Sequence, residues 1–176
     1  MIWIFGDSFA SSDQDLSWTS IIGDTQNFAS NGSSEYRILK NYLLQKPNIK
    51  ENDLVLFVHT SQSRIFLKDD RELSSRMLSS HVKCDIIFND VFEKKEKQYI
   101  EILELIWDDE FFNDIFNLIV DKLLEVPNSH HLTFFESSRV EFVNLNHIWV
   151  NHQGEINHMN ANGNQLVSEI VNQLVH

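Results

Sequence analysis

A serine near the start of the sequence and a histidine near its end could together carry out acyl transfer. Ser8 lies in the segment Gly6-Asp7-Ser8-Phe9, directly after the apolar run Ile2–Phe5. A serine hydroxyl is a weak nucleophile at neutral pH, so it needs a base that takes its proton and a group that orients that base. His158 is the candidate base, because it lies in a polar segment with a carboxylate, Glu155, three residues upstream.

The Gly6-Asp7-Ser8 turn has two interpretations. A serine at a tight turn after a buried strand presents both its hydroxyl and a free backbone N–H to a substrate. The same tripeptide is also a common strand exit without chemistry. In either case we expect Asp7 to fix the turn by accepting hydrogen bonds from nearby backbone N–H groups.

Strands that alternate with helices would bring Ser8 and His158 together. Apolar runs predict strands over Ile2–Phe5, Thr25–Ala29, Leu54–Val58, His131–Phe135 and Glu141–Leu145. Helical spacing predicts a helix capped by Ser33 or Ser34, one near Arg71–Ser80, two over Glu96–Val126 that break around Asp108-Asp109, and one over Asn160–Val175.

This alternation predicts one α/β domain over residues 1–176, with three α/β/α layers and a mainly parallel sheet. The run Leu54–Val58 is apolar on both faces, as is typical of a central parallel strand. Sites in such sheets lie at the carboxyl ends of the strands. Ser8, Gly32, the segment after Val58 and the loop before Asn160 are expected to converge there.

The order and spacing of these residues resemble the sequence blocks of the SGNH/GDSL hydrolase family over nearly the whole chain. The blocks are Gly6-Asp7-Ser8-Phe9, Gly32, and His158 followed by Asn160 and Gly163. The compact chain also resembles the SGNH-type proteins of tailed bacteriophages. The resemblance implies a flavodoxin-like fold, here with a helical insertion, and a serine hydrolase that needs no metal or organic cofactor.

The resemblance also implies roles for individual residues. Ser8 would be the nucleophile, His158 the general base and then acid, and the N–H groups of Ser8 and Gly32 would stabilise the oxyanion. Glu155 would orient His158 where the family has aspartate, which would complete a triad. The alternative is a Ser-His dyad in which Glu155 is a solvated loop acid.

A third oxyanion donor is expected from the segment that follows Val58. The family has a Gly-x-Asn-Asp stretch, whereas this chain reads Val58-His59-Thr60-Ser61-Gln62-Ser63-Arg64. Ser61 aligns best with the asparagine, and Thr60 and Gln62 are substitutes; loss of one such donor typically costs about 100-fold in rate. Arg64 could bind an anionic substrate, although a surface ion pair is the favoured interpretation. His59 is either a second-choice base or a neutral histidine packed at the strand end.

Composition limits the partners. Fourteen basic and twenty-six acidic residues give a net charge of −12, which repels nucleic acids and anionic membranes. The first residues lack the basic region of a signal peptide, and no apolar run approaches the roughly 20 residues of a membrane span. These features predict a soluble protein, cytoplasmic or virion-associated. The five glycines permit no phosphate-binding loop, and the adjacent His130 and His131 lack a metal-site frame.

The leading hypothesis is a serine esterase or acyl hydrolase that acts on an ester or O-acetyl group of a small molecule or carbohydrate. The alternative is a non-catalytic SGNH-fold binding or structural module, for example of a viral particle, with a protein assembly partner. The missing asparagine motivates that alternative. A third interpretation, a flavodoxin-like domain unrelated to hydrolases, predicts that Ser8 and His158 lie too far apart for a hydrogen bond.

Overall fold

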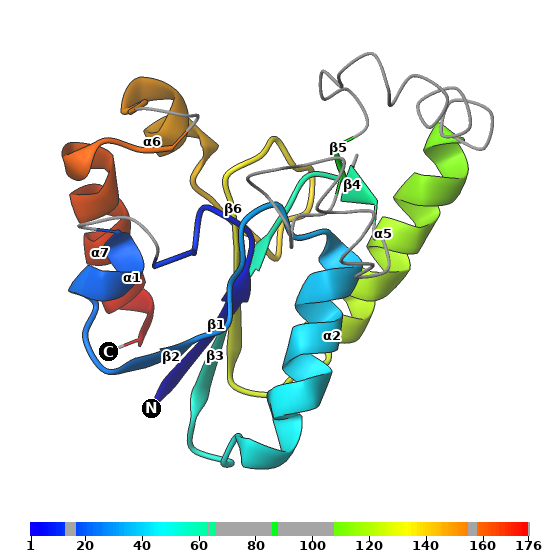
Figure 1. Ribbon diagram of the computed structural model, residues 1–176, viewed down its shortest axis with the longest axis horizontal. Coiled ribbons are helices and arrows are strands. Elements are labelled where there is room, and N and C mark those ends of the chain that lie inside the picture. The colour runs from blue at the N-terminus through cyan, green and yellow to red at the C-terminus, as the bar shows by residue number, and fades with distance from the viewer. Residues whose placement is uncertain (13–16, 63, 66–85, 88–107, 155–157, 176) are drawn as a thin grey trace, which may run out of the picture.

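A five-stranded sheet forms the centre of the protein (Figure 1). The computed structural model describes residues 1–12, 17–62, 64–65, 86–87, 108–154 and 158–175. The strands are β1 (Ile2–Gly6), β2 (Thr25–Asn27), β3 (Leu54–His59), β6 (Ser129–Thr133) and β7 (Val143–Asn144), in the order β2-β1-β3-β6-β7. All four strand pairs are parallel. Numbered within the sheet, this is the order 2-1-3-4-5 of flavodoxin-like folds.

Helices cover both faces of the sheet, which gives the three expected layers. Helices α2 (Glu35–Gln45) and α5 (Asp109–Leu124) lie on one face, and α1 (Trp18–Ile21), α6 (Asn146–Asn151) and α7 (Ala161–Val175) lie on the other (Figure 1). A short 3-10 turn, η1 (Lys46–Asn48), follows α2, and β4 (Arg64–Ile65) pairs with β5 (Ile86–Ile87) in a separate antiparallel ladder. Each face of the sheet has its own buried apolar cluster.

Strand β3 occupies the central position that its apolar run predicts. Val55, Phe57 and their alternating neighbours Leu56 and Val58 are buried on opposite faces of the sheet. Strand β1 pairs with β3 over its whole length, and a Cβ added at Gly6 would lie 2.7 Å from the Cβ of Val58. Glycine at the end of β1 therefore permits a close approach of the two strands.

Helix starts agree with the sequence predictions because their caps are local. The Ser34 hydroxyl accepts the backbone N–H of Arg37 at 3.4 Å and caps α2. The Asp108 carboxylate accepts the backbone N–H of Phe111 at 2.7 Å and caps α5, which confirms a helix start at this point. The predicted helix over residues 71–80, and residues 96–107 of the longer helical prediction, lie outside the described residues.

Strand ends differ from the predictions by a few residues. Strand β2 ends at Asn27 and not at Ala29, because the Asn27 side chain donates to the Ala10 carbonyl at 2.7 Å and accepts the Ala29 N–H at 2.9 Å. Strand β6 begins two residues earlier than predicted and ends at Thr133. The short helices α1 and α6 were not predicted. Helix α1 depends on distant partners, since the Trp18 N–H donates to the Asn164 side chain at 3.1 Å.

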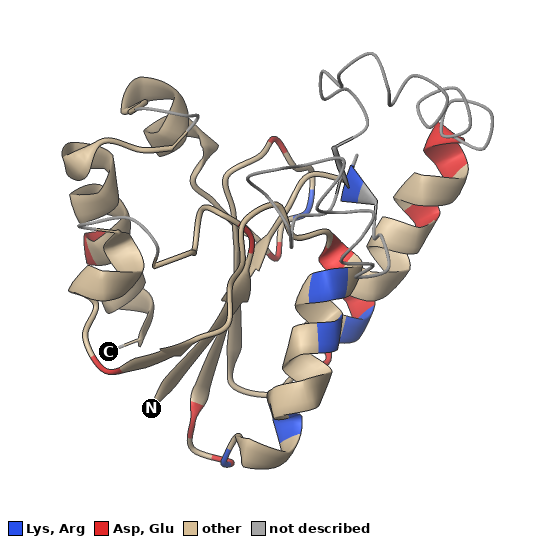
Figure 2. Cartoon of the chain, in the orientation of Figure 1, with Lys and Arg blue, Asp and Glu red and all other residues tan. Residues whose placement is uncertain are grey.

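Charge is distributed unevenly over the two helical layers. Charged residues gather on α2 and α5, whereas α7 carries a single acidic residue, Glu169, and no lysine or arginine (Figure 2).

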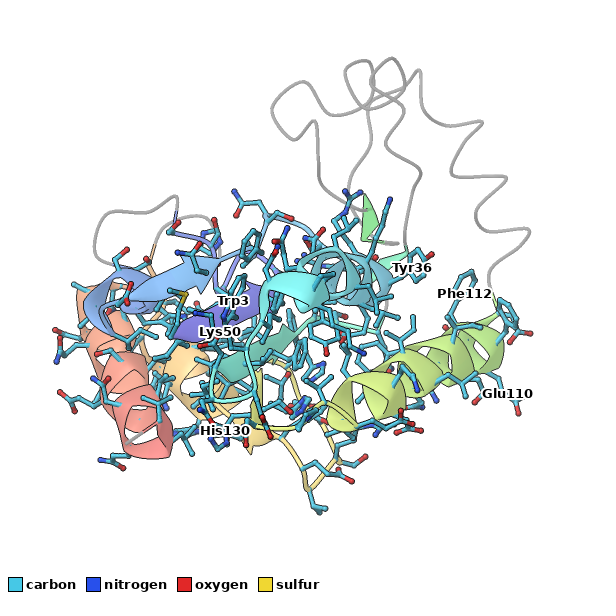
Figure 3. All side chains as sticks on the ribbon, turned by 90° about the horizontal axis from the view of Figure 1, so that it is seen from below. Trp3, Tyr36, Lys50, Glu110, Phe112 and His130 are labelled. Carbon is cyan, nitrogen blue, oxygen red and sulfur yellow. The ribbon has the colours of Figure 1, made fainter. Side chains whose placement is uncertain are left out.

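Near the start of β1, Trp3 lies beside the turn that carries Lys50 (Figure 3). In this turn Asp53 accepts the Trp3 indole N–H at 2.9 Å. No helix in the described part of the chain is both long enough and apolar enough to cross a membrane.

Candidate functional site

Ser8 lies at the first turn after β1, at the carboxyl edge of the sheet. Its side chain is half-buried, and the backbone turns at once, with the Ala10 N–H donating to the Asp7 carbonyl at 3.1 Å. The Asp7 carboxylate accepts the Phe9 N–H at 3.0 Å, which confirms its predicted role in fixing the turn. Ser8 therefore lies on a constrained backbone and is only partly buried.

His158 packs against the ring of Phe9, the residue that follows Ser8. The centres of the Phe9 and His158 rings lie 5.9 Å apart in an edge-to-face arrangement. Burial, and to a lesser extent the positive charge of Arg64, lowers the pKa of His158. The imidazole is therefore neutral at pH 7, as a general base must be.

The loop that carries His158 is fixed by backbone contacts. The Gly154 N–H donates to the His158 carbonyl at 2.6 Å, and the Asn160 side chain accepts the Gly163 N–H at 3.1 Å at the start of α7. A Cβ at Gly163 would lie 2.8 Å from the Cβ of His152, so glycine lets α7 pack against this loop.

The ring of His158 has no hydrogen bond to Ser8 within the described part of the chain. Its Nδ1 atom is buried and has no partner there, which leaves the position of an orienting acid open. Glu155, the predicted orienting acid, lies outside the described residues. The missing Ser8–His158 hydrogen bond agrees with the third interpretation, a flavodoxin-like domain unrelated to hydrolases, and the triad stays a prediction.

The loop of Gly32 lies beside the end of β1. The Ser30 N–H donates to the Gly6 carbonyl at 3.1 Å, and the Ser33 N–H donates back to the Ser30 carbonyl at 3.2 Å. Gly32 has a φ of 72°, a left-handed conformation that favours glycine. The loop therefore reaches the same edge of the sheet as Ser8, where the predicted oxyanion donor is needed.

Thr60 has both of its donors engaged by buried carboxylates. Its N–H donates to Glu35 Oε2 at 3.2 Å, and its hydroxyl donates to Asp7 Oδ2 at 3.1 Å. These bonds tie the end of β3 to the Ser8 turn and leave no Thr60 donor for a substrate. The neighbouring Ser61 is half-buried, and its carbonyl accepts the Arg64 N–H at 3.1 Å.

Arg64 forms an ion pair, as the favoured interpretation expected, but this pair is largely buried and does not lie on the surface. Its side chain is only 8% exposed, and its Nη1 atom lies 3.5 Å from Asp7 Oδ2. The Nε and Nη1 atoms are buried without a hydrogen-bond partner in the described part of the chain. Burial raises the pKa of Asp7, and the Arg64 charge opposes that rise. Arg64 therefore places a cation beside Asp7, and two of its nitrogen atoms have no hydrogen-bond partner among the described residues.

Sequence reasoning missed a buried chain of polar side chains next to this site. His59 Nδ1 lies 2.7 Å from Glu35 Oε1, and His59 Nε2 lies 2.9 Å from His131 Nδ1. The ring of Phe142 stacks on His59 with 4.2 Å between ring centres. Of the two interpretations of His59, the packed histidine at the strand end agrees with this burial. The sequence shows both histidines. Their contact could have been predicted only with the register in which β3 and β6 pair.

A pocket of about 440 Å³ adjoins the segment Thr60–Gln62. Its lining combines uncharged polar groups with aromatic rings: Thr60, Ser61, Gln62, Asn113, Asn117, Thr133, Ser137, Ser138, Phe116, Phe135 and Phe142, together with Glu136 and Arg139. The Arg139 guanidinium is already held by Asn117 at 2.8 Å and Asp121 at 2.7 Å. The pocket therefore offers neutral hydrogen-bonding groups close to Ser61.

No protein-family model matches the chain, and no curated protein matches it. The resemblance to SGNH/GDSL hydrolases therefore rests on the site residues and on the strand order. Within the described residues, no group of three or more histidine, cysteine or acidic side chains could hold a metal ion.

Proposed function

We propose that the protein is a serine ester hydrolase of the SGNH/GDSL type, with Ser8 as nucleophile and His158 as base. The observation that carries this proposal is the contact of a half-buried His158, whose pKa is lowered, with Phe9, the residue that follows Ser8. The flavodoxin-like strand order supports it, because the carboxyl edge of such a sheet is where ligands bind.

The reaction would proceed through an acyl-enzyme. His158 takes the proton of the Ser8 hydroxyl as the Ser8 oxygen bonds to the ester carbonyl carbon, and the carbonyl oxygen becomes an oxyanion. Collapse of this intermediate breaks the bond to the alcohol, which leaves with the proton from His158. Water, activated by His158, then attacks the acyl group and releases the acid and free Ser8.

Stabilisation of the oxyanion would come from the backbone N–H groups of Ser8 and Gly32. Ser61 aligns best with the asparagine of the family, and its hydroxyl is the candidate third donor. Arg64 adds a buried positive charge beside Asp7, and a cation near developing negative charge stabilises it strongly in a dry site. The Arg64 charge thus offers a reason why the chain could do without the asparagine.

Active-site labelling tests this function. Wild-type protein is expected to react with a fluorophosphonate and to hydrolyse p-nitrophenyl acetate, and Ser8→Ala is expected to lose both, with a rate reduction of about 1,000-fold or more. Ser12→Ala, at an exposed serine of the same loop, is the matched control and should keep both activities. Labelling that persists in Ser8→Ala would remove Ser8 from the nucleophile role.

A non-catalytic binding module is the second candidate. Ser61 in place of asparagine favours it, as does an exposed apolar row along α5, where Phe111, Ile115 and Leu118 are 56%, 40% and 65% exposed. Light scattering and a pull-down from the native source discriminate the two. A stable stoichiometric complex without esterase activity would support the module, for example as part of a viral particle.

A further inference from the structure

The polar chain behind the site runs without a break from β6 to the Ser8 turn. It begins at Ser129 on β6, passes through His131 and His59, and reaches Glu35 on α2. Glu35 accepts the Thr60 N–H, Thr60 donates to Asp7, and Asp7 accepts the N–H that follows Ser8. Each contact between side chains in this chain is 2.7 to 3.1 Å long.

The direction of each hydrogen bond can be followed from Ser129. Its hydroxyl donates to the Val126 carbonyl at 2.7 Å, so the oxygen must accept from His131 Nε2, 2.9 Å away. Burial, with the nearby His59 and His130 charges, lowers the pKa of His131 to about 3, which keeps it neutral. A neutral ring that donates through Nε2 accepts through Nδ1. His59 must therefore donate its Nε2–H to His131.

This direction leaves a conflict at the other nitrogen of His59. A neutral His59 that donates through Nε2 has a lone pair on Nδ1, and that lone pair would face a carboxylate oxygen of Glu35 at 2.7 Å. Two acceptors at this distance repel each other, and the side chains of His59 and Glu35 are only 0% and 3% exposed, so no solvent relieves them. One additional proton between the two atoms removes the conflict.

We propose that Glu35 and His59 hold one shared buried proton between Oε1 and Nδ1, and that this pair positions the Thr60 turn and, through Asp7, the Ser8 turn. The pair is then neutral overall, as burial requires. Both are positioning residues, since neither lies at the reacting atoms. The positioning role rests on the proposed esterase function, whereas the shared proton does not.

Magnetic resonance of the wild-type protein tests the proton directly. Side-chain ¹⁵N and ¹³C spectra at pH 7 are expected to show either a hydrogen on His59 Nδ1 or a protonated Glu35 carboxyl, and to show His131 with its hydrogen on Nε2. An ionised Glu35 together with a bare His59 Nδ1 would overturn the shared proton. This measurement depends neither on catalysis nor on the folding of a variant.

Two substitutions of similar size test the positioning. In Glu35→Gln the amide can accept from Thr60 and donate to His59, so kcat should stay within about threefold of wild type while the extra proton is lost. Glu35→Met removes both bonds, and kcat should fall about tenfold or more with a smaller change in KM. Amide exchange of Thr60 should be slow in wild type and Glu35→Gln and faster in Glu35→Met.

The outcomes separate the two claims. An unchanged kcat and an unchanged Thr60 exchange rate in Glu35→Met would overturn the positioning while the esterase stands. A wild-type protein without esterase activity would overturn the proposed function. Slow amide exchange of Thr60 that depends on Glu35 would then still support the positioning of the Thr60 turn. If Glu35→Met does not fold, the wild-type spectra and the kinetics of Glu35→Gln still test the proposal. A loss of kcat of more than about tenfold in Glu35→Gln would contradict it.

Discussion

At the scale of single residues, burial and neighbouring groups act in opposite directions on the ionisation of Asp7. Asp7 is fully buried, yet it accepts bonds from Phe9 and Thr60 and has the Arg64 guanidinium 3.5 Å away. Each of these groups favours the ionised carboxylate, while burial disfavours it. Burial has the largest effect, so the pKa of the carboxyl that fixes the Ser8 turn is raised, and these three neighbours limit the rise.

His131 should make the stability of the fold dependent on pH. Its pKa is lowered to about 3 in the folded protein and is about 6.5 in the unfolded chain, so the unfolded state binds more protons between these values. Stability is fully present above about pH 6.5 and falls as the pH decreases, by up to about 1.4 kcal/mol per pH unit from this group.

Urea unfolding of wild type and His131→Gln between pH 7 and 4.5 measures this dependence. The variant is expected to be less stable at pH 7 and to lose less stability on acidification. The raised pKa of Asp7 acts in the opposite sense in both proteins, so the difference between them isolates His131. His130→Gln is the control and should keep most of the wild-type slope; equal slopes in wild type and His131→Gln would contradict the prediction.

At the scale of elements, β1 and β3 approach each other closely at Gly6. A Cβ at Gly6 would lie 2.7 Å from the Val58 Cβ and 3.1 Å from the Ala10 Cβ. Gly6→Ala must therefore push the strands apart, and we expect a loss of about 1–3 kcal/mol and a Tm lower by roughly 3–10 °C.

Thermal unfolding of Gly6→Ala beside Thr25→Ala checks this expectation. Thr25 lies half-buried on the edge strand β2, so its truncation should change stability much less. If the two variants melted at the same temperature, the close approach of β1 and β3 would not constrain the Ser8 turn.

Elements were predictable where their signals are local. The caps Ser34 and Asp108 fixed the starts of α2 and α5, and the doubly apolar run of β3 fixed the centre of the sheet. The end of β2 was missed because the Asn27 side chain bonds to Ala10, a tertiary contact. The burial of Arg64 and the partners of His59 were missed for the same reason, since Arg64 pairs with the distant Asp7 and the contact of His59 with His131 depends on the register of β3 and β6.

At the scale of the whole molecule, the net charge of −12 should act on substrates before they bind. A field of this sign repels anionic esters, and salt screens it with a Debye length of about 8 Å at physiological ionic strength. For an anionic ester, kcat/KM should rise as NaCl increases from about 10 to 150 mM.

A neutral ester of the same acyl group provides the comparison for this salt effect. Its kcat/KM should change little over the same range, because an uncharged ester is neither repelled nor attracted by the net charge of the protein. A fall in kcat/KM for the anionic ester would instead indicate that local attraction by the buried Arg64 outweighs the field of the molecule.

The all-parallel sheet also has a consequence for how the protein reaches its folded state. In the centre of the sheet, β1 pairs Ile2 with Leu54 of β3, and β3 pairs Val55 with Ser129 of β6, so these strand pairs join residues that are far apart in the sequence. Such long-range pairings slow folding, to about milliseconds or longer. Ser8 precedes His158 by 150 residues, so on the proposed function a nascent chain would carry the nucleophile without its base until the segment around His158 has been made and packed.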